Sequence, residues 1–135
     1  KIFKYLVILQ PTSPLRDEKD IDKCCSIILK NNFDSLVSIE KVKHNYYPQN
    51  LYNKKKFQIH PISKKQILKN RQTYQKLYAR NGAAIYITKS KNVKKFILGK
   101  KTAGYVMPEW KSVDINNVLE FKFAEFIMKN KSLIK

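Results

Sequence analysis

The sequence predicts an α/β domain, and three observations lead to that prediction. The five apolar residues at 5–9 are typical of a strand that is buried on both faces. An amphipathic stretch of about 14 residues follows, and residues 34–42 then alternate between apolar and polar side chains. Strand, helix and strand in this order form a βαβ unit, for which a right-handed crossover is expected.

Length and composition indicate one soluble domain over residues 1–135. The chain is 43% hydrophobic and its mean hydropathy is -0.49. No apolar run approaches the ~20 residues that span a bilayer. The chain also lacks an apolar signal segment at its start, so we expect a cytoplasmic protein that does not bind membranes.

The net charge of +18 comes from 28 Lys and Arg against 10 Asp and Glu. Such an excess attracts anionic ligands. The basic residues are scattered along the whole sequence, however, without the zinc spacing or aromatic pattern of nucleic-acid-binding modules. We therefore expect no dedicated nucleic-acid binding, and a lysine-rich polyanion binder is the least favoured of the functions considered below.

The two cysteines, Cys24 and Cys25, are adjacent in an apolar helical stretch. Neighbouring cysteines do not form a useful cross-link, so they indicate core residues in a reducing compartment. Neither His44 nor His60 belongs to a recognisable pattern with them, so we expect no catalytic cysteine.

A polar turn follows the first strand. Pro11 and Pro14 prevent further strand pairing and make the turn rigid. Gln10, Thr12 and Ser13 supply hydrogen-bonding groups there, at the carboxyl end of a strand, where ligands bind in open α/β sheets. A simpler interpretation is that Ser13 caps the next helix, with Pro14 in its first position. The two interpretations are compatible.

The remaining elements are expected in chain order. Acidic residues at the start of residues 17–30 and a lysine at the end suit a helix dipole. A hairpin with a basic tip at 51–59 looks like an excursion from the sheet that covers a ligand or a partner subunit. The other expected elements are a short helix at 71–78, a turn at Asn81-Gly82, a β-rich run at 83–88, a helix at 90–98 ended by Gly99, a strand ending near 105–108 and a final helix from Asn116 or Asn117 to 128.

Asp114 and Asn116 are two residues apart in an extended segment. Side chains at this spacing point the same way, so both could contact one ion. Mg²⁺ prefers such oxygen ligands together with substrate phosphates. The alternatives are that Asp114 caps the following turn, that Arg71 is one more surface cation and that Tyr86 is a core residue.

Three stretches together resemble the acylneuraminate cytidylyltransferases, the CMP-sialic acid synthetase family. The first is Leu-Gln-Pro-Thr-Ser-Pro-Leu-Arg at 9–16. The second is Arg-Gln at 71–72 followed by Tyr-Ala-Arg-Asn-Gly-Ala-Ala-Ile-Tyr at 78–86. The third comprises Met-Pro at 107–108, Ser-Val-Asp-Ile-Asn at 112–116, Phe121 and Ala-Glu at 124–125. Their order and spacing agree over nearly the whole chain.

The resemblance implies the C-terminal portion of a Rossmann-like nucleotide-diphospho-sugar transferase fold, with a mixed sheet. It implies transfer of CMP from CTP to a nine-carbon 2-keto sugar acid of sialic, legionaminic or pseudaminic type, with release of pyrophosphate. Family members require Mg²⁺ and are generally homodimers. Residues 43–88 would then form a sugar-covering and dimerisation arm.

The resemblance also implies roles for individual residues. Arg71 would bind the sugar carboxylate, because its planar guanidinium binds carboxylates through two hydrogen bonds. Asp114 and Arg71 would act in catalysis, and Asp114 with Asn116 would bind the metal. The substrate-binding residues implied are Gln10, Thr12, Ser13, Arg71 and Tyr86.

The sequence departs from the family pattern in three ways. Asn116 stands where the family has a second metal-binding aspartate, and Glu120 stands where an aspartate is usual. The family's glycine-rich, triphosphate-binding stretch has no counterpart among the three glycines of this chain. We therefore expect a truncated protein that is inactive alone, and whose first strand exposes an unpaired edge. The alternatives are a non-catalytic dimerising module and one half of a split enzyme that joins a separate N-terminal half.

Overall fold

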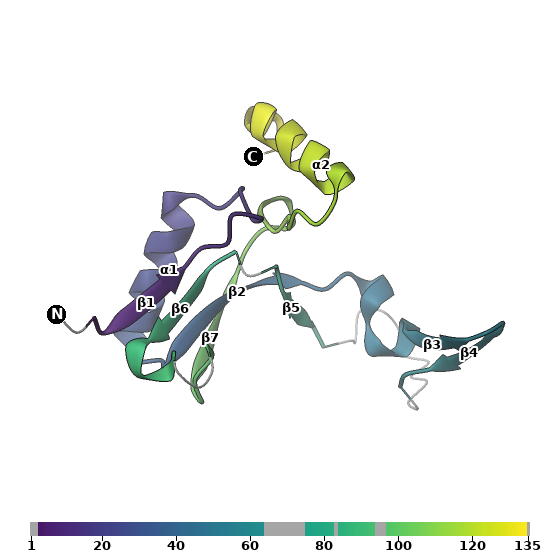
Figure 1. Ribbon diagram of the computed structural model, residues 1–135, viewed down its shortest axis with the longest axis horizontal. Helices are drawn as coiled ribbons and strands as arrows, with labels where there is room; N and C mark the ends of the chain where they lie inside the picture. The colour runs from purple at the N-terminus through teal and green to yellow at the C-terminus, as the bar shows by residue number, and fades with distance from the viewer. Residues whose placement is uncertain (1–2, 64–74, 83, 94–96, 135) are drawn as a thin grey trace. The chain divides into compact units, whose positions relative to one another are not determined.

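The computed structural model describes residues 3–63, 75–82, 84–93 and 97–134 (Figure 1). The chain forms two compact units. The first contains Lys1–Glu40 and Arg80–Lys135, and the second contains Lys41–Ala79.

The first unit is built on a mixed sheet with the strand order β1-β6-β2 and with β7 paired to β2. The strands are β1 (Tyr5–Ile8), β2 (Ser35–Lys41), β6 (Tyr86–Lys89) and β7 (Thr102–Val106). β6 runs antiparallel to both β1 and β2, and β7 runs parallel to β2. The predicted α/β class with a mixed sheet is therefore confirmed.

The prediction that the first strand is buried on both faces is wrong. Among the described residues β1 pairs with β6 alone, on one side. Leu6 keeps 41% of its surface exposed and Val7 keeps 40%. The apolar run has the composition of an interior strand, but no strand in the described part of the chain pairs with its second side.

Helix α1 (Glu18–Asn31) connects β1 to β2, as predicted (Figure 1). Its N-cap is Asp17, which forms a reciprocal capping box with Asp20. The prediction that Ser13 caps this helix is thus wrong, because a better-placed carboxylate follows four residues later. Cys24 and Ile28 of α1 pack into the main apolar core.

The core beneath α1 is formed by residues from the helix and from three strands of the sheet and their flanks. Its buried members are Cys24, Ile28, Leu36, Ala84, Ile85, Ile87, Ala103 and Met107. Burial raises the pKa of the Cys24 thiol to about 12, so it stays protonated at neutral pH. A nucleophilic thiolate is therefore not expected there.

A second, smaller core holds the C-terminal helix. The N-cap of helix α2 (Val118–Lys129) is Asn117, which is one of the two positions that the sequence predicted. The short helix α3 (Lys131–Ile134) follows α2. Leu15, Ala124 and Ile127 form the buried centre of this core. It joins the turn after β1 to α2.

The segment after β6 differs from the prediction of a helix at 90–98. Ser90–Asn92 form a single 3₁₀ turn, η4, residues 97–98 are not helical, and residues 94–96 lie outside the described residues. Gly99 does not end a helix there. A Cβ at Gly99 would lie 2.4 Å from Cβ of Asp34, so the position requires glycine for a close approach.

The second unit contains the predicted hairpin. β3 (Tyr52–Lys55) and β4 (Gln58–Pro61) are antiparallel, and Lys56 adopts a positive φ of 53° in the turn between them. Two 3₁₀ turns, η1 (His44–Tyr46) and η2 (Pro48–Asn50), precede it. Every residue of both hairpin strands is exposed.

The prediction of a helix at 71–78 is wrong for the described residues of this segment. Residues 71–74 lie outside the described residues, residues 75–77 are not helical, and Tyr78 begins strand β5 (Tyr78–Arg80). Tyr78 is a residue type that favours an extended conformation.

A search of the described helices found none with both the length and the apolar character to span a bilayer.

Candidate functional site

The turn after β1 is held in shape by one arginine. Nη1 of Arg16 donates hydrogen bonds to the carbonyl oxygens of Gln10, at 2.6 Å, and Ser13, at 2.5 Å. Burial lowers the pKa of the Arg16 guanidinium from its ordinary value, and an arginine side chain keeps its charge in proteins. The guanidinium therefore holds two carbonyls of the turn in place.

Ser13 brings this turn to two other parts of the chain. Its side chain is fully buried, and Oγ lies 3.4 Å from the carbonyl oxygen of Gly82 and 3.5 Å from Oδ1 of Asp114. Close by, the amide of Ile115 donates a 2.8 Å hydrogen bond to the carbonyl of Thr12. Segments that are 69 and 101 residues apart from Ser13 in sequence thus meet at one hydroxyl.

Gly82 allows Asp114 to approach the backbone. Its φ is +60°, a conformation that costs a residue with a Cβ about 1 kcal/mol or more. A Cβ at this position would lie 2.3 Å from Cγ of Asp114 and 2.5 Å from Oδ2. The carboxylate therefore occupies space that any other residue at position 82 would fill.

A buried hydrogen-bond network fixes the segments that carry Gly82 and Asp114. Asn81 is its centre: Oδ1 accepts from Oγ of Ser38 at 2.7 Å, and Nδ2 donates to Oγ of Ser112 at 3.0 Å. Ser38 also accepts from the amide of Ile85, and Ser112 donates to the carbonyl of Pro108. Sequence reasoning identified Asn81 only as a turn residue, because Ser38 and Ser112 are distant from it in sequence.

Asp114 and Asn116 lie side by side. Nδ2 of Asn116 is 3.4 Å from Oδ2 of Asp114 and 3.2 Å from its carbonyl oxygen. The amide can present its oxygen by rotating half a turn, since the two ends have the same shape. One carboxylate and one amide oxygen suit a hard cation that takes its other ligands from phosphates and water.

The other predicted site residues are placed differently. Gln10 and Thr12 are exposed, and they join the cluster through their backbone carbonyls. Tyr86 lies in β6 with 9% of its surface exposed, and its hydroxyl accepts a 3.4 Å hydrogen bond from Arg80. Arg71 lies outside the described residues.

An ion cluster at the start of α1 was not predicted. Nζ of Lys111 lies 2.6 Å from Oδ2 of Asp17 and 2.8 Å from Oδ2 of Asp20, and Tyr105 donates to Oδ1 of Asp20 at 3.0 Å. Only 7% of Lys111 is exposed. The sequence signal for such a cluster is weak, because Lys111 is one lysine among many.

The charges in this cluster shift one another's pKa values. The hydrogen bond from Lys111 lowers the pKa of Asp17 to about 2, against the opposing effect of burial. Burial alone would lower the pKa of Lys111, but its hydrogen bonds to Asp17 and Asp20 outweigh burial and raise it. Burial and the hydrogen bond to Asp20 raise the pKa of Tyr105. These pKa shifts keep Asp17 and Lys111 ionised at neutral pH and keep Tyr105 neutral.

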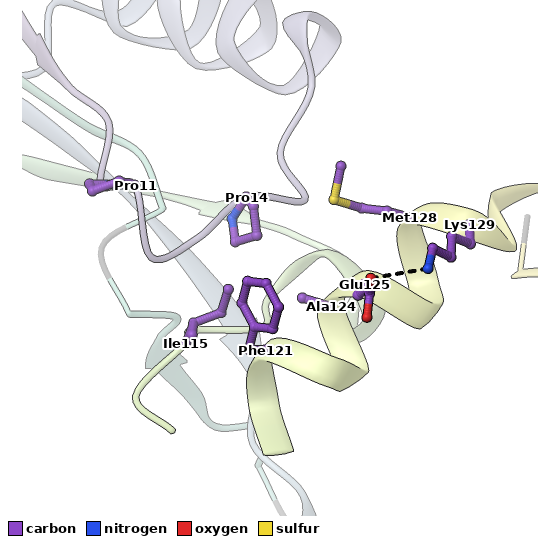
Figure 2. A pocket seen from close by; sticks show the side chains of 8 residues that line it. All are labelled: Pro11, Pro14, Ile115, Phe121, Ala124, Glu125, Met128 and Lys129. Atoms are coloured by element: carbon purple, nitrogen blue, oxygen red, sulfur yellow. Dashed lines mark hydrogen bonds and ion pairs between the residues drawn. The ribbon is translucent and has the colours of Figure 1, made fainter. Parts of the chain in front are cut away.

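An apolar pocket of about 450 Å³ lies between the turn and α2 (Figure 2). Pro11 and Pro14 form one wall and Ile115 another, while an ion pair between Glu125 and Lys129 stands at the helix side. The full lining is Pro11, Pro14, Ile115, Phe121, Ala124, Glu125, Met128 and Lys129. Pro14 and Ile115 are the chain neighbours of Ser13 and Asp114, so the pocket and the polar cluster are built on the same two segments.

A scan of the sequence against protein-family models found no match. The chain is similar to the "Post-translational flagellin modification protein B" of Campylobacter coli, with 31% identity over 135 aligned residues. The alignment covers 97% of this chain and 55% of that protein. The chain thus spans about half the length of this relative.

Proposed function

We propose that the chain is part of a nucleotidyltransferase that transfers CMP from CTP to a nine-carbon 2-keto sugar acid and releases pyrophosphate. The observation that supports this most is the meeting of Ser13, Gly82 and Asp114 at one point. These residues come from three separate stretches of the sequence, and each stretch matches one block of the cytidylyltransferase pattern.

The similarity to a flagellin modification protein supports the same assignment. An enzyme that activates a sugar acid supplies the form of the sugar that can be attached to a protein. We propose an acid of sialic, legionaminic or pseudaminic type as the substrate. Because the chain spans about half of its relative, the complete reaction is assigned to this chain together with further polypeptide.

The proposed reaction is a displacement at phosphorus. The anomeric hydroxyl oxygen of the sugar acid forms a bond to the α-phosphorus of CTP, the bond to the bridging oxygen of the β-phosphate breaks, and pyrophosphate leaves. The hydroxyl proton passes to a base or to water. Such a transfer depends on positioning and on neutralisation of charge more than on covalent catalysis.

Asp114 and Asn116 are the residues proposed to hold Mg²⁺. When bound, Mg²⁺ neutralises phosphate charge in this class of reaction. Within the described ranges no cluster of three or more His, Cys, Asp or Glu side chains could hold a metal. One carboxylate with one neutral amide therefore predicts weak binding that substrate phosphates strengthen. We also propose that Asp114 orients the attacking hydroxyl.

The sugar is proposed to contact Gln10, Arg71 and Tyr86. The guanidinium of Arg71 would pair with the sugar carboxylate, and Gln10 would donate or accept hydrogen bonds at the exposed turn. Thr12 and Ser13 would complete this wall of the site. A homodimer, in which the second unit reaches the neighbouring subunit, is part of the proposal.

The test measures pyrophosphate release from CTP with each of the three sugar acids in the presence of Mg²⁺. The chain is assayed alone and after co-expression with the part of the Campylobacter coli protein that it does not match. We expect no release from the chain alone, and release from the combined proteins. Asp114→Asn should reduce that release at least 100-fold, whereas Asp22→Asn, at an exposed position on α1, should leave it unchanged.

A direct metal measurement separates metal binding from turnover. Calorimetric titration with Mg²⁺ in the presence of CTP should show about tenfold tighter binding for Asn116→Asp, which restores a second carboxylate. If the Asp114→Asn variant released as much pyrophosphate as the unaltered protein, the proposed role of Asp114 would be contradicted. An absence of release with all three acids from a well-folded combined protein would contradict the proposed reaction.

A second candidate is a non-catalytic module that binds other polypeptides. The exposed hairpin and the open edge of β1 favour it. In that case the combined proteins would form a stable complex but release no pyrophosphate.

A further inference from the structure

We propose that Asn81 is a positioning residue, whose buried side-chain amide determines where the carboxylate of Asp114 lies against Gly82. This role rests on the proposed function, because Asp114 is the residue proposed to hold Mg²⁺. Asn81 acts through the two chain segments that it joins and not by contact with the substrate. Three features of the structure point to this role.

The first feature is the fixed direction of the Asn81 amide, of which the whole residue is only 2% exposed. Oγ of Ser112 donates to the carbonyl oxygen of Pro108 at 3.0 Å, so it accepts from Nδ2 of Asn81 at 3.0 Å. Oγ of Ser38 accepts from the amide of Ile85 at 2.9 Å and donates its own proton to Oδ1 of Asn81 at 2.7 Å. One hydroxyl needs a donor and the other an acceptor, which an amide supplies and a carboxylate or an apolar side chain does not.

The second feature is the pair of segments that the amide joins. Asn81 directly precedes Gly82, and Ser112 lies two residues before Asp114. A Cβ at Gly82 would lie 2.4 Å from Cβ of Asp114, so the two segments touch at these positions. The hydrogen bond between Asn81 and Ser112 links the same segments beside that contact. A change in this bond therefore changes the space that the carboxylate occupies.

The third feature is that the carboxylate of Asp114 has only long contacts of its own among the described residues. Oδ1 lies 3.5 Å from Oγ of Ser13, and Oδ2 lies 3.4 Å from Nδ2 of Asn116. Both distances exceed the usual range for hydrogen bonds. The ion pairs of Lys111 tie the same segment to α1 and not to Gly82. The position of the carboxylate therefore follows its backbone, which the Asn81 side chain holds.

The first measurement uses the whole isotope-labelled chain in solution. The nuclear Overhauser effect between the α protons of Gly82 and the β protons of Asp114 reports their contact. Asn81→Leu has nearly the same shape but neither donor nor acceptor, so we expect it to abolish this effect. Ser112→Ala removes only the acceptor for Nδ2 and should weaken the effect, whereas Ser112→Thr keeps the hydroxyl and should retain it.

The second measurement is the binding of Mn²⁺, added together with CTP, because Mn²⁺ shares the preference of Mg²⁺ for oxygen ligands. Broadening of the amide signals of residues 113–116 gives the affinity. Asn81→Leu should weaken the affinity about tenfold, as the loss of a group that orients a metal ligand commonly does. Asn81→Leu combined with Ser112→Ala should bind no more weakly than Asn81→Leu, because both changes break the same link.

Ile28→Ala is the matched control for a general loss of stability. Ile28 is buried in the core beneath α1 and takes no part in the Asn81 network. Its truncation leaves a cavity, so urea denaturation should show at least as large a loss of stability as for Asn81→Leu. The contact between Gly82 and Asp114 should nevertheless persist, and the Mn²⁺ affinity should stay within about twofold.

A folded Asn81→Leu variant that retains the contact between Gly82 and Asp114 would overturn the proposal, and so would equal losses in Ile28→Ala. If Asn81→Leu does not fold by circular dichroism, Ser112→Ala takes its place and the same two results decide. Absence of Mn²⁺ broadening in the unaltered chain would contradict the proposed metal role of Asp114. In that case the effect of the variants on the contact between Gly82 and Asp114 alone decides the role of Asn81.

Discussion

At the scale of single residues, Gly82 and Asp114 show how closely the candidate site is fitted. The carboxylate of Asp114 lies where a Cβ at position 82 would be, and Ser13 closes the other side. The polarity of these positions was predictable from the sequence. Their contact was not, because it joins residues that lie far apart in the chain.

Replacing Gly82 by alanine should destabilise the protein and displace Asp114. We expect a loss of about 2–4 kcal/mol, from the positive φ and from the overlap with the carboxylate. Gly104→Ala is the matched control, because its Cβ would meet only the flexible end of Ile39, at 2.6 Å. That control should cost less than about 1 kcal/mol. Urea denaturation measures both, and equal losses would show that the Asp114 contact is unimportant.

Ser13 shows where residue-scale reasoning from the sequence reaches its limit. Its position before a proline made it a reasonable helix cap, yet its hydroxyl is buried against Gly82 and Asp114. Propensity describes the local backbone, whereas burial depends on segments that arrive from elsewhere. The same limit explains why Asn81 was identified only as part of a turn.

At the scale of elements, Lys111 links the turn η5 (Glu109–Lys111) to the first turn of α1. It pairs with both members of the Asp17–Asp20 capping box. The helix start was predictable, since its acidic residues and its length are visible in the sequence. The lysine that pairs with those acids was not predictable, because the sequence contains many lysines that could do so.

Lys111→Met should cost about 3–5 kcal/mol, because it leaves the almost fully buried Asp20 without its counter-charge. Lys122→Met is the control, since its ion pair with Glu125 is exposed and should contribute little to the free energy of unfolding. The measurement is urea denaturation at pH 7. A similar loss in both variants would show that burial of the pair contributes nothing.

The same cluster predicts a pH dependence. Because the pKa of Asp17 is lowered to about 2 in the folded protein, its contribution is fully present above the ordinary value near 4. It is lost as the pH falls from about 4 towards 2. The Lys111→Met variant should lose most of this acid sensitivity, which denaturation between pH 5 and pH 2 would measure.

At the scale of the whole molecule, the hairpin in the second unit is amphipathic. The register pairs Tyr52 with Pro61 and Lys54 with Ile59, whereas Asn53 pairs with His60 on the opposite face. An isolated two-stranded hairpin is marginally stable in water. The exposed Tyr52 and Ile59 are therefore suited to contact with another protein surface, which the proposed homodimer would supply.

The double variant Tyr52→Ser and Ile59→Ser should convert a dimer to a monomer, measured by light scattering after gel filtration. The control is Asn53→Ser with His60→Ser, which changes the polar face of the same hairpin and should remain dimeric. A monomeric mass for the unaltered chain would contradict the dimer. An unchanged dimer in the first variant would assign the contact to another surface.

The identity and order of the main elements were predicted better than the environment of each element. The βαβ unit, the hairpin and the final helix follow from periodicity and turn residues, and all three are present. The burial of β1 and the helix at 90–98 were predicted wrongly. Both errors concern segments whose environment depends on neighbours that local sequence does not specify.

The apolar pocket beside the turn offers a point of chemical control. Its walls include Pro14 and Ile115, which adjoin Ser13 and Asp114. A compact apolar compound seated there would contact the two segments that carry Ser13 and Asp114, and it would need no phosphate group to bind. For the proposed cytidylyltransferase reaction, such a compound is the starting point for an uncharged inhibitor.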